Sequence, residues 1–284
     1  MSFKFNFSGE DVAESSTTDT LYIPWFDCKE VVPTNQMEEL DSIVKHAKMF
    51  ICGDVEIGHV VTSEAIANIL STNDTYNATE CAEKDHSDLV VGKYEGGLKI
   101  WECTYDLVEY LINNSDKINF VSARVLDLGC GAGILGIYAF INGANVTFQD
   151  YNQEVLEHVT IPNVLLNIEE EEDTAKLLKR CRFYSGDWAS FNNKYDESEM
   201  YDLILTSETI YNDNNYDKLI NIFIKRLSKT GAVYLAAKTC YFGVGGGVRQ
   251  FEQKLENNGA LQSEICWKST GGIQREILKI THKL

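Results

Sequence analysis

Three glycines at alternate positions mark the first place where this chain could bind a small molecule. In the run VLDLGCGAGILG, residues 125–136, an apolar strand-like segment ends at Gly129, Gly131 and Gly133, and a helix-like segment follows. Glycine lets a backbone turn tightly and approach a ligand where a Cβ would clash. The loop therefore predicts a nucleotide cofactor, although NAD-binding folds and methyltransferase folds share this pattern.

Acidic residues near the loop favour one of these cofactors. Asp150, at the end of the second strand-like run, could bind ribose hydroxyls in either fold. Asp127 would repel a pyrophosphate but attract the cationic methionine end of S-adenosylmethionine. After the third strand-like run, Asp187 can accept from an adenine amino group and the Trp188 indole can cover an apolar ring. The sequence predicts S-adenosylmethionine; the alternative is that Asp127 caps a turn and Trp188 belongs to the core.

Alternating strand-like and helix-like runs must position these residues. They begin near residue 120, and the tail ends in two strand-like runs joined at residues 270–272, as in a hairpin. Repeated βαβ units give a parallel sheet with helices on both faces. We expect an α/β, class I S-adenosylmethionine-dependent methyltransferase fold: a seven-stranded, mostly parallel sheet with a closing antiparallel hairpin, plus an N-terminal extension. The expected divisions are a largely disordered segment over 1–35, a small extension and linker over 36–88, and the methyltransferase domain over 89–284.

The extension carries weaker signals. Apolar residues at helical spacing within 35–50 predict a short helix, and SEAIANILS at 63–71 predicts another. The segment 8–22 is rich in Ser, Thr, Asp and Glu, which is typical of disorder.

Composition narrows the partners. The chain has 284 residues and a net charge of −18, from 43 acidic and 25 basic residues. This balance repels phosphate backbones, so we expect no direct nucleic-acid binding; it fits either solubility alone or a basic protein partner. No apolar run has the length of a membrane span, and the start resembles no signal peptide. Eight scattered cysteines without a CxxC pair or clustered histidines predict no metal site and reduced thiols in the cytoplasm or nucleus.

Longer stretches carry a more specific resemblance. They are GKYEGGLKIWECTYDL (92–107), VLDLGCGAGILG, FQDYN (148–152), YDLILTSETIYN (201–212) and YFGVGGGV (241–248), together with FKFNF at 3–7. The chain closely resembles the eukaryotic histidine protein methyltransferases, whose member in yeast and animals modifies a histidine of large-subunit ribosomal protein three. The resemblance runs from about residue 85 to the C-terminus.

The resemblance implies a set of cofactor contacts. They come from the glycine loop and from the positions matching Ile100, Trp101, Glu102, Cys103, Thr104, Gln149, Asp150, Tyr151, Gly186, Asp187, Trp188 and Ser207. Family members often carry Glu at the position of Asp187, so the carboxylate here has a shorter reach. From the sequence alone, Trp101 fits the core better than a ligand site. Only the resemblance makes a cofactor contact the preferred role for this residue.

The segment after the fourth strand-like run suggests the chemistry. Glu208 and Tyr211 form a Glu-x-x-Tyr element that resembles the acidic-x-x-aromatic motif of related protein lysine methyltransferases. A neutral imidazole, with a reference pKa near about 6.5, already offers a lone pair at cellular pH. We expect Glu208 to accept the N–H of the non-reacting ring nitrogen and Tyr211 to wall the ring. The alternative is that Glu208 caps a helix and Tyr211 packs in the core.

The glycine-rich run YFGVGGGV lacks the Lys and Ser/Thr of a phosphate-binding loop. Its place after the fifth strand-like run predicts a substrate-side loop with Tyr241, Phe242 and Gly245 near the target side chain; a plain connecting loop is the alternative.

The favoured activity is methylation of a protein histidine, with large-subunit ribosomal protein three as the substrate and the tele nitrogen as the position that the resemblance implies. The other readings are a protein lysine methyltransferase, an NAD-dependent oxidoreductase, and a binding module that has lost catalysis. We expect a monomer.

Overall fold

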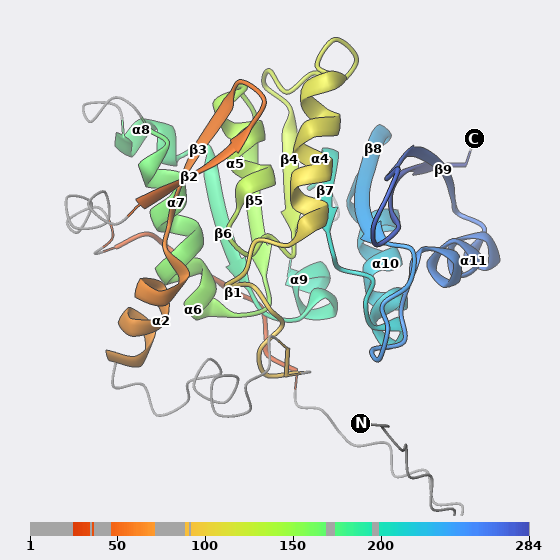
Figure 1. Cartoon of the computed structure of the whole chain (residues 1–284), viewed down its shortest axis with the longest axis horizontal. Coiled ribbons are helices and arrows are strands. Elements are labelled where there is room, and N and C mark those ends of the chain that lie inside the picture. Colours follow the sequence, from red (N-terminus) through yellow and green to blue (C-terminus); the bar gives the residue numbers. More distant parts are fainter. Residues whose placement is uncertain are drawn as a thin grey trace, which may run out of the picture.

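A mixed eight-stranded sheet forms the centre of the molecule (Figure 1). The structure is a computed structural model, and it describes residues 25–34, 36, 47–71, 89–90, 92–168, 174–194 and 199–283. In spatial order the strands are β1 (Lys29–Glu30), β6 (Cys181–Ser185), β5 (Asn145–Asp150), β4 (Arg124–Leu128), β7 (Tyr201–Ser207), β8 (Leu227–Lys238), β10 (Arg275–His282) and β9 (Leu261–Lys268).

The five strands from β6 to β8 run parallel to one another. The last two strands form the hairpin that the sequence predicts: β10 pairs antiparallel with β8, and β9 pairs antiparallel with β10. The class I methyltransferase fold is therefore confirmed. Since parallel strands bring their carboxyl ends to one edge, the loops after β4 to β8 meet there.

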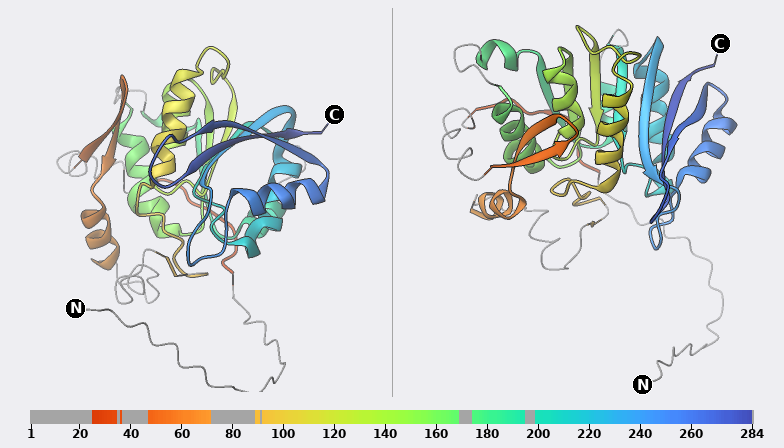
Figure 2. Two further views of the ribbon diagram at one scale, coloured as in Figure 1. Left: turned by 45° about the vertical axis from the view of Figure 1, so that its right-hand side comes forward. Right: turned by 45° about the horizontal axis from the view of Figure 1, so that its top comes forward.

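Helices cover both faces of the sheet, as the two rotated views show (Figure 2). Buried apolar residues form two separate clusters, one with the stacked rings of Phe148 and Phe183 and the other with the edge-to-face rings of Phe223 and Phe251. Beside the first cluster lie α2 (Thr62–Ser71), α4 (Glu102–Asn113), α5 (Ile134–Ile141) and α8 (Thr174–Leu178). One continuous helical run also lies there, made of α6 (Gln153–Val155), η2 (Leu156–Thr160) and α7 (Ile161–Leu166). Beside the second cluster lie α9 (Trp188–Lys194), α10 (Tyr216–Arg226) and α11 (Val248–Asn258).

The expected helix over 35–50 is wrong for residues 47–50. Residues 47–52 form strand β2 (Ala47–Cys52), which pairs antiparallel with β3 (Val55–Val60). The two-residue loop between them begins at Gly53, whose φ of 58° suits a tight hairpin turn. The helix-spaced residues 37–46 lie outside the described residues, as does the FKFNF stretch.

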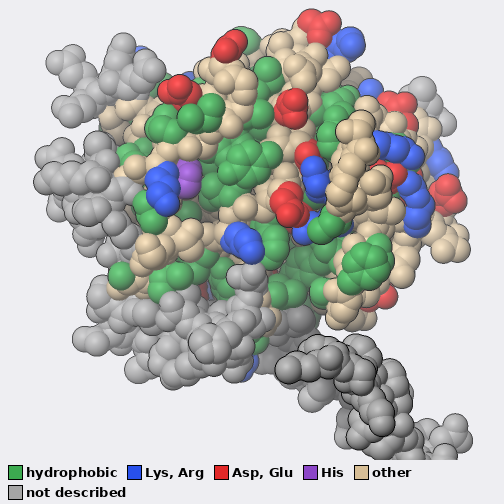
Figure 3. Space-filling view, viewed as in Figure 1, with side chains coloured by type: hydrophobic (Ala, Val, Ile, Leu, Met, Phe, Trp, Pro, Cys, Tyr) green, Lys and Arg blue, Asp and Glu red, His purple; other side chains and the backbone are tan. Residues whose placement is uncertain are grey.

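The small β2–β3 sheet packs across α4. The rings of Phe50 and Tyr105 stack with centroids 4.4 Å apart. Figure 3 shows hydrophobic side chains between acidic and basic ones over this part of the face, where Met49, Ile51 and Tyr105 are exposed. Tyr105 therefore lies at an exposed contact with the hairpin.

The sheet differs from the seven-stranded expectation by strand β1. This strand pairs antiparallel with β6, placing Lys29 opposite Ser185 and Glu30 opposite Tyr184. Residues 25–34 thus lie against the sheet, within the segment 1–35 that was expected to be largely disordered; residues 1–24 lie outside the described part. Within that part, no helix is long and apolar enough to cross a membrane.

Candidate functional site

A cavity of about 430 Å³ lies at the carboxyl ends of the parallel strands. This volume falls within the range of about 300–1,000 Å³ that small-molecule sites occupy. Its walls come from the loop after β4, the ends of β5, β6, β7 and β8, and the turn at 95–101. Trp25, from the segment before β1, completes them. Residues far apart in sequence therefore share one cavity.

The glycine loop lies against the turn that precedes α4. The φ values of Gly129 and Gly131 are 67° and 49°, in the left-handed region that favours glycine. A Cβ at Gly131 would lie only 2.9 Å from the carbonyl oxygen of Gly97. The loop therefore needs glycine both for its backbone conformation and for the close approach of these two segments.

Two buried carboxylates support the same loop. An oxygen of Asp150 accepts a hydrogen bond from the backbone N–H of Gly131 at 2.8 Å, and an oxygen of Asp127 accepts one from Gly136 at 2.8 Å. Burial raises the pKa of Asp127 to about 8, opposed by the Gly136 N–H and reinforced by the charge of Asp150. Burial likewise raises the pKa of Asp150 to about 6. Both carboxyl groups line the cavity, where a cationic group of a ligand would favour their charged forms.

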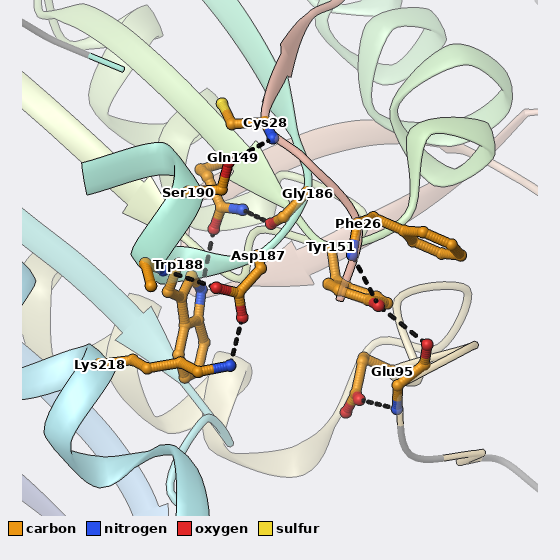
Figure 4. A network of polar contacts seen from close by, with 12 residues as sticks. Phe26, Cys28, Glu95, Gln149, Tyr151, Gly186, Asp187, Trp188, Ser190 and Lys218 are labelled. Atoms are coloured by element: carbon orange, nitrogen blue, oxygen red, sulfur yellow. Dashed lines mark hydrogen bonds and ion pairs between the residues drawn. The ribbon is translucent and has the colours of Figure 1, made fainter. Parts of the chain in front are cut away.

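Gln149 holds the wall on the far side of this loop (Figure 4). Its amide nitrogen donates to the carbonyl oxygen of Gly186 at 2.8 Å, and its amide oxygen accepts from the Trp188 indole N–H at 2.9 Å. Gln149 is fully buried behind the cavity, so it orients Trp188 without lining the cavity itself.

Asp187 has its acceptors occupied by the protein. One carboxylate oxygen lies 2.5 Å from Nζ of Lys218, and the other accepts the backbone N–H of Ala189 at 2.9 Å (Figure 4). The Lys218 ammonium also lies 3.5 Å from the centroid of the Trp25 ring. The expected contact of Asp187 with an adenine amino group would share an oxygen already bonded to Lys218 or to the backbone.

The N-terminal segment is fastened beside the cavity at several points. The N–H of Cys28 donates to Ser190 at 2.8 Å, and the carbonyl oxygen of Phe26 accepts the N–H of Asp187 at 2.9 Å. The rings of Phe26 and Tyr151 stack with centroids 5.0 Å apart. Gly186 is required beneath this segment, because a Cβ there would lie 2.6 Å from the carbonyl oxygen of Asp27.

Glu208 occupies an unusual position after β7. It has a φ of 59°, which is uncommon for a residue other than glycine and costs roughly 1–3 kcal/mol. Its side chain is 6% exposed, and within the described part neither carboxylate oxygen makes a hydrogen bond of regular geometry. The Cys103 thiol and the Tyr241 hydroxyl lie close enough that, besides burial, Glu208 raises their pKa values. The nearest cation in that part is Lys238, whose Nζ lies 3.6 Å from one of these oxygens. A buried, charged acceptor at a strained position in a cavity wall is typical of a functional site.

Two tyrosines flank Glu208. The hydroxyl of Tyr211 donates to the carboxylate of Glu95, and burial and that carboxylate raise the pKa of Tyr211 well above its usual value. The ring of Tyr241 lies 6.4 Å from that of Tyr211, nearly perpendicular to it. Burial and the charge of Glu208 also raise the pKa of Tyr241, so both phenols stay neutral.

The glycine-rich run folds back onto Tyr211. The N–H of Gly246 donates to the carbonyl oxygen of Tyr211 at 2.9 Å, and a Cβ at Gly246 would lie 2.1 Å from the carbonyl oxygen of Ile210. The run therefore forms a wall beside Glu208. Its exposed part carries Phe242, which is 87% exposed at the mouth of the cavity.

Comparisons with known proteins place the chain in a family. The family described as Lysine methyltransferase matches residues 80–244, more than half of the chain. The chain belongs to this methyltransferase family. Its relatives include Histidine protein methyltransferase 1 homolog of Bos taurus, 44% identical over 219 residues, and that of Dictyostelium discoideum, 43% identical over 202 residues. These matches cover 70% of this chain and 58% and 62% of the relatives, respectively.

Among solved structures, the N-methyltransferase NodS from Bradyrhizobium japonicum, in complex with S-adenosyl-L-homocysteine, is similar with a TM-score of 0.47 and 14% identity. This match covers 78% of the present chain and 99% of NodS.

As a member of this methyltransferase family, the chain uses S-adenosylmethionine, the cofactor that the sequence predicts. The cavity fits that cofactor. Buried carboxyl groups at Asp127 and Asp150 suit an ammonium and ribose hydroxyls, and the aromatic walls at Trp25, Tyr151 and Trp188 suit an adenine ring.

Most predicted site residues line this one cavity. They are Ile100, Trp101, Thr104, Asp127, Gly129, Gly131, Asp150, Tyr151, Gly186, Asp187, Trp188, Ser207, Glu208, Tyr211, Tyr241 and Phe242. Thr104 and Ser207, distant in sequence, share a hydrogen bond of 2.8 Å between their hydroxyls.

The other five predicted site residues do not line the cavity. Glu102 points its carboxylate to Lys238, and Cys103 is fully buried in the core. Gly133 is the N-cap of α5, where a Cβ would meet Thr160, and Gly245 has open space around it. Gln149 acts from behind, as described above. These five residues support or border the walls.

The structure adds residues that the sequence reasoning missed. Trp25, Glu95, Lys99, Thr209 and Lys238 line the same cavity. Lys238 carried a usable signal, because it ends the fifth strand-like run, AVYLAAK at 232–238, at the sheet edge where ligands bind.

Proposed function

We propose that this chain is a protein-histidine N-methyltransferase that uses S-adenosylmethionine. The names of its relatives at 43–44% identity support the activity. The observation that carries it is Glu208, a buried carboxylate that makes no hydrogen bond of regular geometry in the described part and lines the cavity.

A carboxylate in this position suits an imidazole acceptor. The cofactor, when bound, supplies an electrophilic methyl group. Glu208 accepts the N–H of the ring nitrogen that does not react, which fixes the tautomer and steadies the positive charge that develops on the ring. Tyr211 and Tyr241, whose rings meet edge to face, form one neutral aromatic wall beside the imidazole. The chain then has to orient the ring rather than remove a proton from a strongly basic amine.

The substrate we propose is large-subunit ribosomal protein three, methylated at the tele nitrogen of one histidine. Ribosomal proteins are basic, and the net charge of −18 suits such a partner. We further propose that the chain acts as a monomer in the cytoplasm, the nucleus or both, without binding nucleic acid or membranes directly.

A protein-lysine methyltransferase is the second candidate. The description of the matching family and the Glu-x-x-Tyr element at 208–211 favour it.

One assay separates the candidates. The full chain is incubated with labelled S-adenosylmethionine and ribosomal proteins from cells that lack the endogenous enzyme; labelled proteins are then hydrolysed and their methylated amino acids identified. The proposal expects tele-methylhistidine in large-subunit ribosomal protein three. Methyllysine would move the chain to the second candidate, and absence of label with cofactor binding intact would refute this substrate or favour a module without catalysis.

A further inference from the structure

Lys238 places a positive charge at the end of the cavity beside Glu208, called here the acceptor end. It is the last residue of β8, next to the end of β7, where Glu208 stands. Its side chain is 16% exposed and lines the cavity. Its Nζ lies 3.0 Å from a carboxylate oxygen of Glu102 and 3.6 Å from one of Glu208.

Two carboxylates and two rings hold this ammonium in place. Glu102 comes from the first turn of α4 and Glu208 from the segment after β7, so Lys238 is bound from two elements. The rings of Trp101 and Tyr241 lie 5.5 and 5.9 Å from Nζ, within reach of a cation–π interaction. Such a held side chain cannot swing freely away from an incoming group.

The charge persists at cellular pH. Burial lowers the pKa of Lys238, but the hydrogen bond and charge of Glu102 and the charge of Glu208 outweigh burial and raise it. The nearest other cation on the paired strand, Arg275, is bound to Asp106. The acceptor end therefore carries a fixed ammonium whenever the enzyme works.

We infer that Lys238 is a specificity-determining residue, whose ammonium offsets the charge of Glu208 and so weakens its attraction for a cationic amine, while Glu208 can still accept the N–H of a neutral imidazole. This inference rests on the proposed function. A lysine side chain, with a reference pKa of about 10.4, would enter as a cation and would gain little from a carboxylate already paired with Lys238. A histidine, with a reference pKa of about 6.5, enters uncharged at pH 7.5–8 and can still donate its N–H to Glu208.

The inference also gives Glu102 a role. The resemblance predicts a cofactor contact for this residue, whereas its carboxylate is 58% exposed and bonded to Lys238. Glu102 is then a positioning residue that holds the ammonium from outside the cavity.

A binding experiment tests the inference without a known substrate. The full chain is saturated with S-adenosylhomocysteine and titrated at pH 8 with imidazole and with n-butylammonium, with NMR chemical shifts of the protein as the readout. In the wild type, imidazole should bind at least about tenfold more tightly than n-butylammonium. Lys238→Met should reduce that ratio about tenfold, and Lys238→Arg should keep it.

Cofactor affinity serves as the folding control. S-adenosylhomocysteine should bind Lys238→Met and Lys238→Arg within about threefold of the wild type, because Lys238 lies at the acceptor end. An unchanged imidazole-to-amine ratio in Lys238→Met with intact cofactor binding would overturn the inference, as would tight n-butylammonium binding by the wild type.

Identifying the methylated amino acid after turnover distinguishes a failure of the proposed function from a failure of the role of Lys238. If the wild type forms methylhistidine but Lys238→Met keeps the wild-type ratio of probe affinities, the function stands and the role of Lys238 falls. If the wild type forms methyllysine, the proposed function fails, and so does the inference that rests on it.

Discussion

The ammonium of Lys218 bridges Asp187 and Trp25, lying 2.5 Å from a carboxylate oxygen of the first and 3.5 Å from the ring centroid of the second. Asp187 ends the turn after β6, and Trp25 belongs to the segment that leads into β1. This bridge ties the N-terminal segment to the wall of the cofactor cavity. The segment therefore forms part of the cavity wall.

Replacing Trp25 should weaken cofactor binding. Trp25→Ala removes one aromatic wall and the cation–π partner of Lys218, a contact worth ~1–2 kcal/mol when desolvated, so the Kd for S-adenosylhomocysteine should rise about tenfold. Isothermal titration calorimetry measures this change. Trp25→Phe is the matched control and should recover much of the affinity; equal affinity in the alanine variant would mean that the ring does not contact the cofactor.

Neutralising Glu208 should separate activity from stability. Glu208→Gln should lower kcat about 10²–10³-fold, as for loss of a preorganised electrostatic group. The melting temperature should change little, because the variant loses both the cost of a poorly bonded buried charge and its ion pair with Lys238. Single-turnover kinetics and thermal unfolding test the two expectations together. Activity close to that of the wild type would remove Glu208 from the catalytic site.

The stability of the cofactor-free protein should fall as pH rises from about 4 to 8. Burial raises the folded-state pKa of Asp127 to about 8, above its ordinary value of 3.8, so the folded protein binds more protons than the unfolded chain across this window. Stability therefore decreases with pH there. Urea unfolding at pH 5 and pH 8 measures it, and Asp127→Asn should show a smaller loss than the wild type. An identical loss in both proteins would contradict the assignment to Asp127.

Cofactor affinity should change with pH in the opposite direction. The amino group of the cofactor favours charged Asp127, so binding releases a proton and the affinity rises by up to about tenfold per pH unit between pH 6 and 8. Titration of S-adenosylhomocysteine at four pH values provides the measurement. A flat profile would mean that Asp127 stays protonated in the complex.

The glycine loop should tolerate no side chain at Gly131. Gly131→Ala forces a left-handed residue, costing roughly 1–2 kcal/mol, and pushes against the Gly97 carbonyl oxygen. The melting temperature should fall and cofactor affinity should decrease more than about tenfold. Gly271→Ala, which has nothing within 4 Å, is the matched control and should change neither. Similar melting temperatures for the two variants would refute the predicted clash.

Local signals were enough to predict the sheet and the strand ends that form the cavity, whereas the family resemblance was needed for lining residues such as Trp101 and Ser207. Strand and helix periods alternate from residue 120, and ligand sites follow from strand ends, so Asp127, Asp150 and Glu208 could be placed without coordinates. Trp25 and Glu95 could not, because they reach the cavity through contacts with residues more than 50 positions away.

The β2–β3 hairpin shows a different kind of failure. Apolar residues at helical spacing in 35–50 favoured a helix, yet the Gly-Asp pair at 53–54 is a two-residue hairpin signal. The turn decided the structure of the residues beside it.

Asp187 was placed correctly in the wall, but its ion pair with Lys218 depends on packing of α10 that no local pattern encodes.

Strand β1 also closes the sheet on the side of β6. An uncovered β6 would present unpaired N–H and C=O groups, a template for pairing with another chain and hence for aggregation. The two residues of β1, with the charged Lys29 and Glu30, cover that edge with a strand too short and too polar to recruit another. Displacing the segment from Trp25 onward would therefore expose a self-association site in the same movement that opens the cofactor wall.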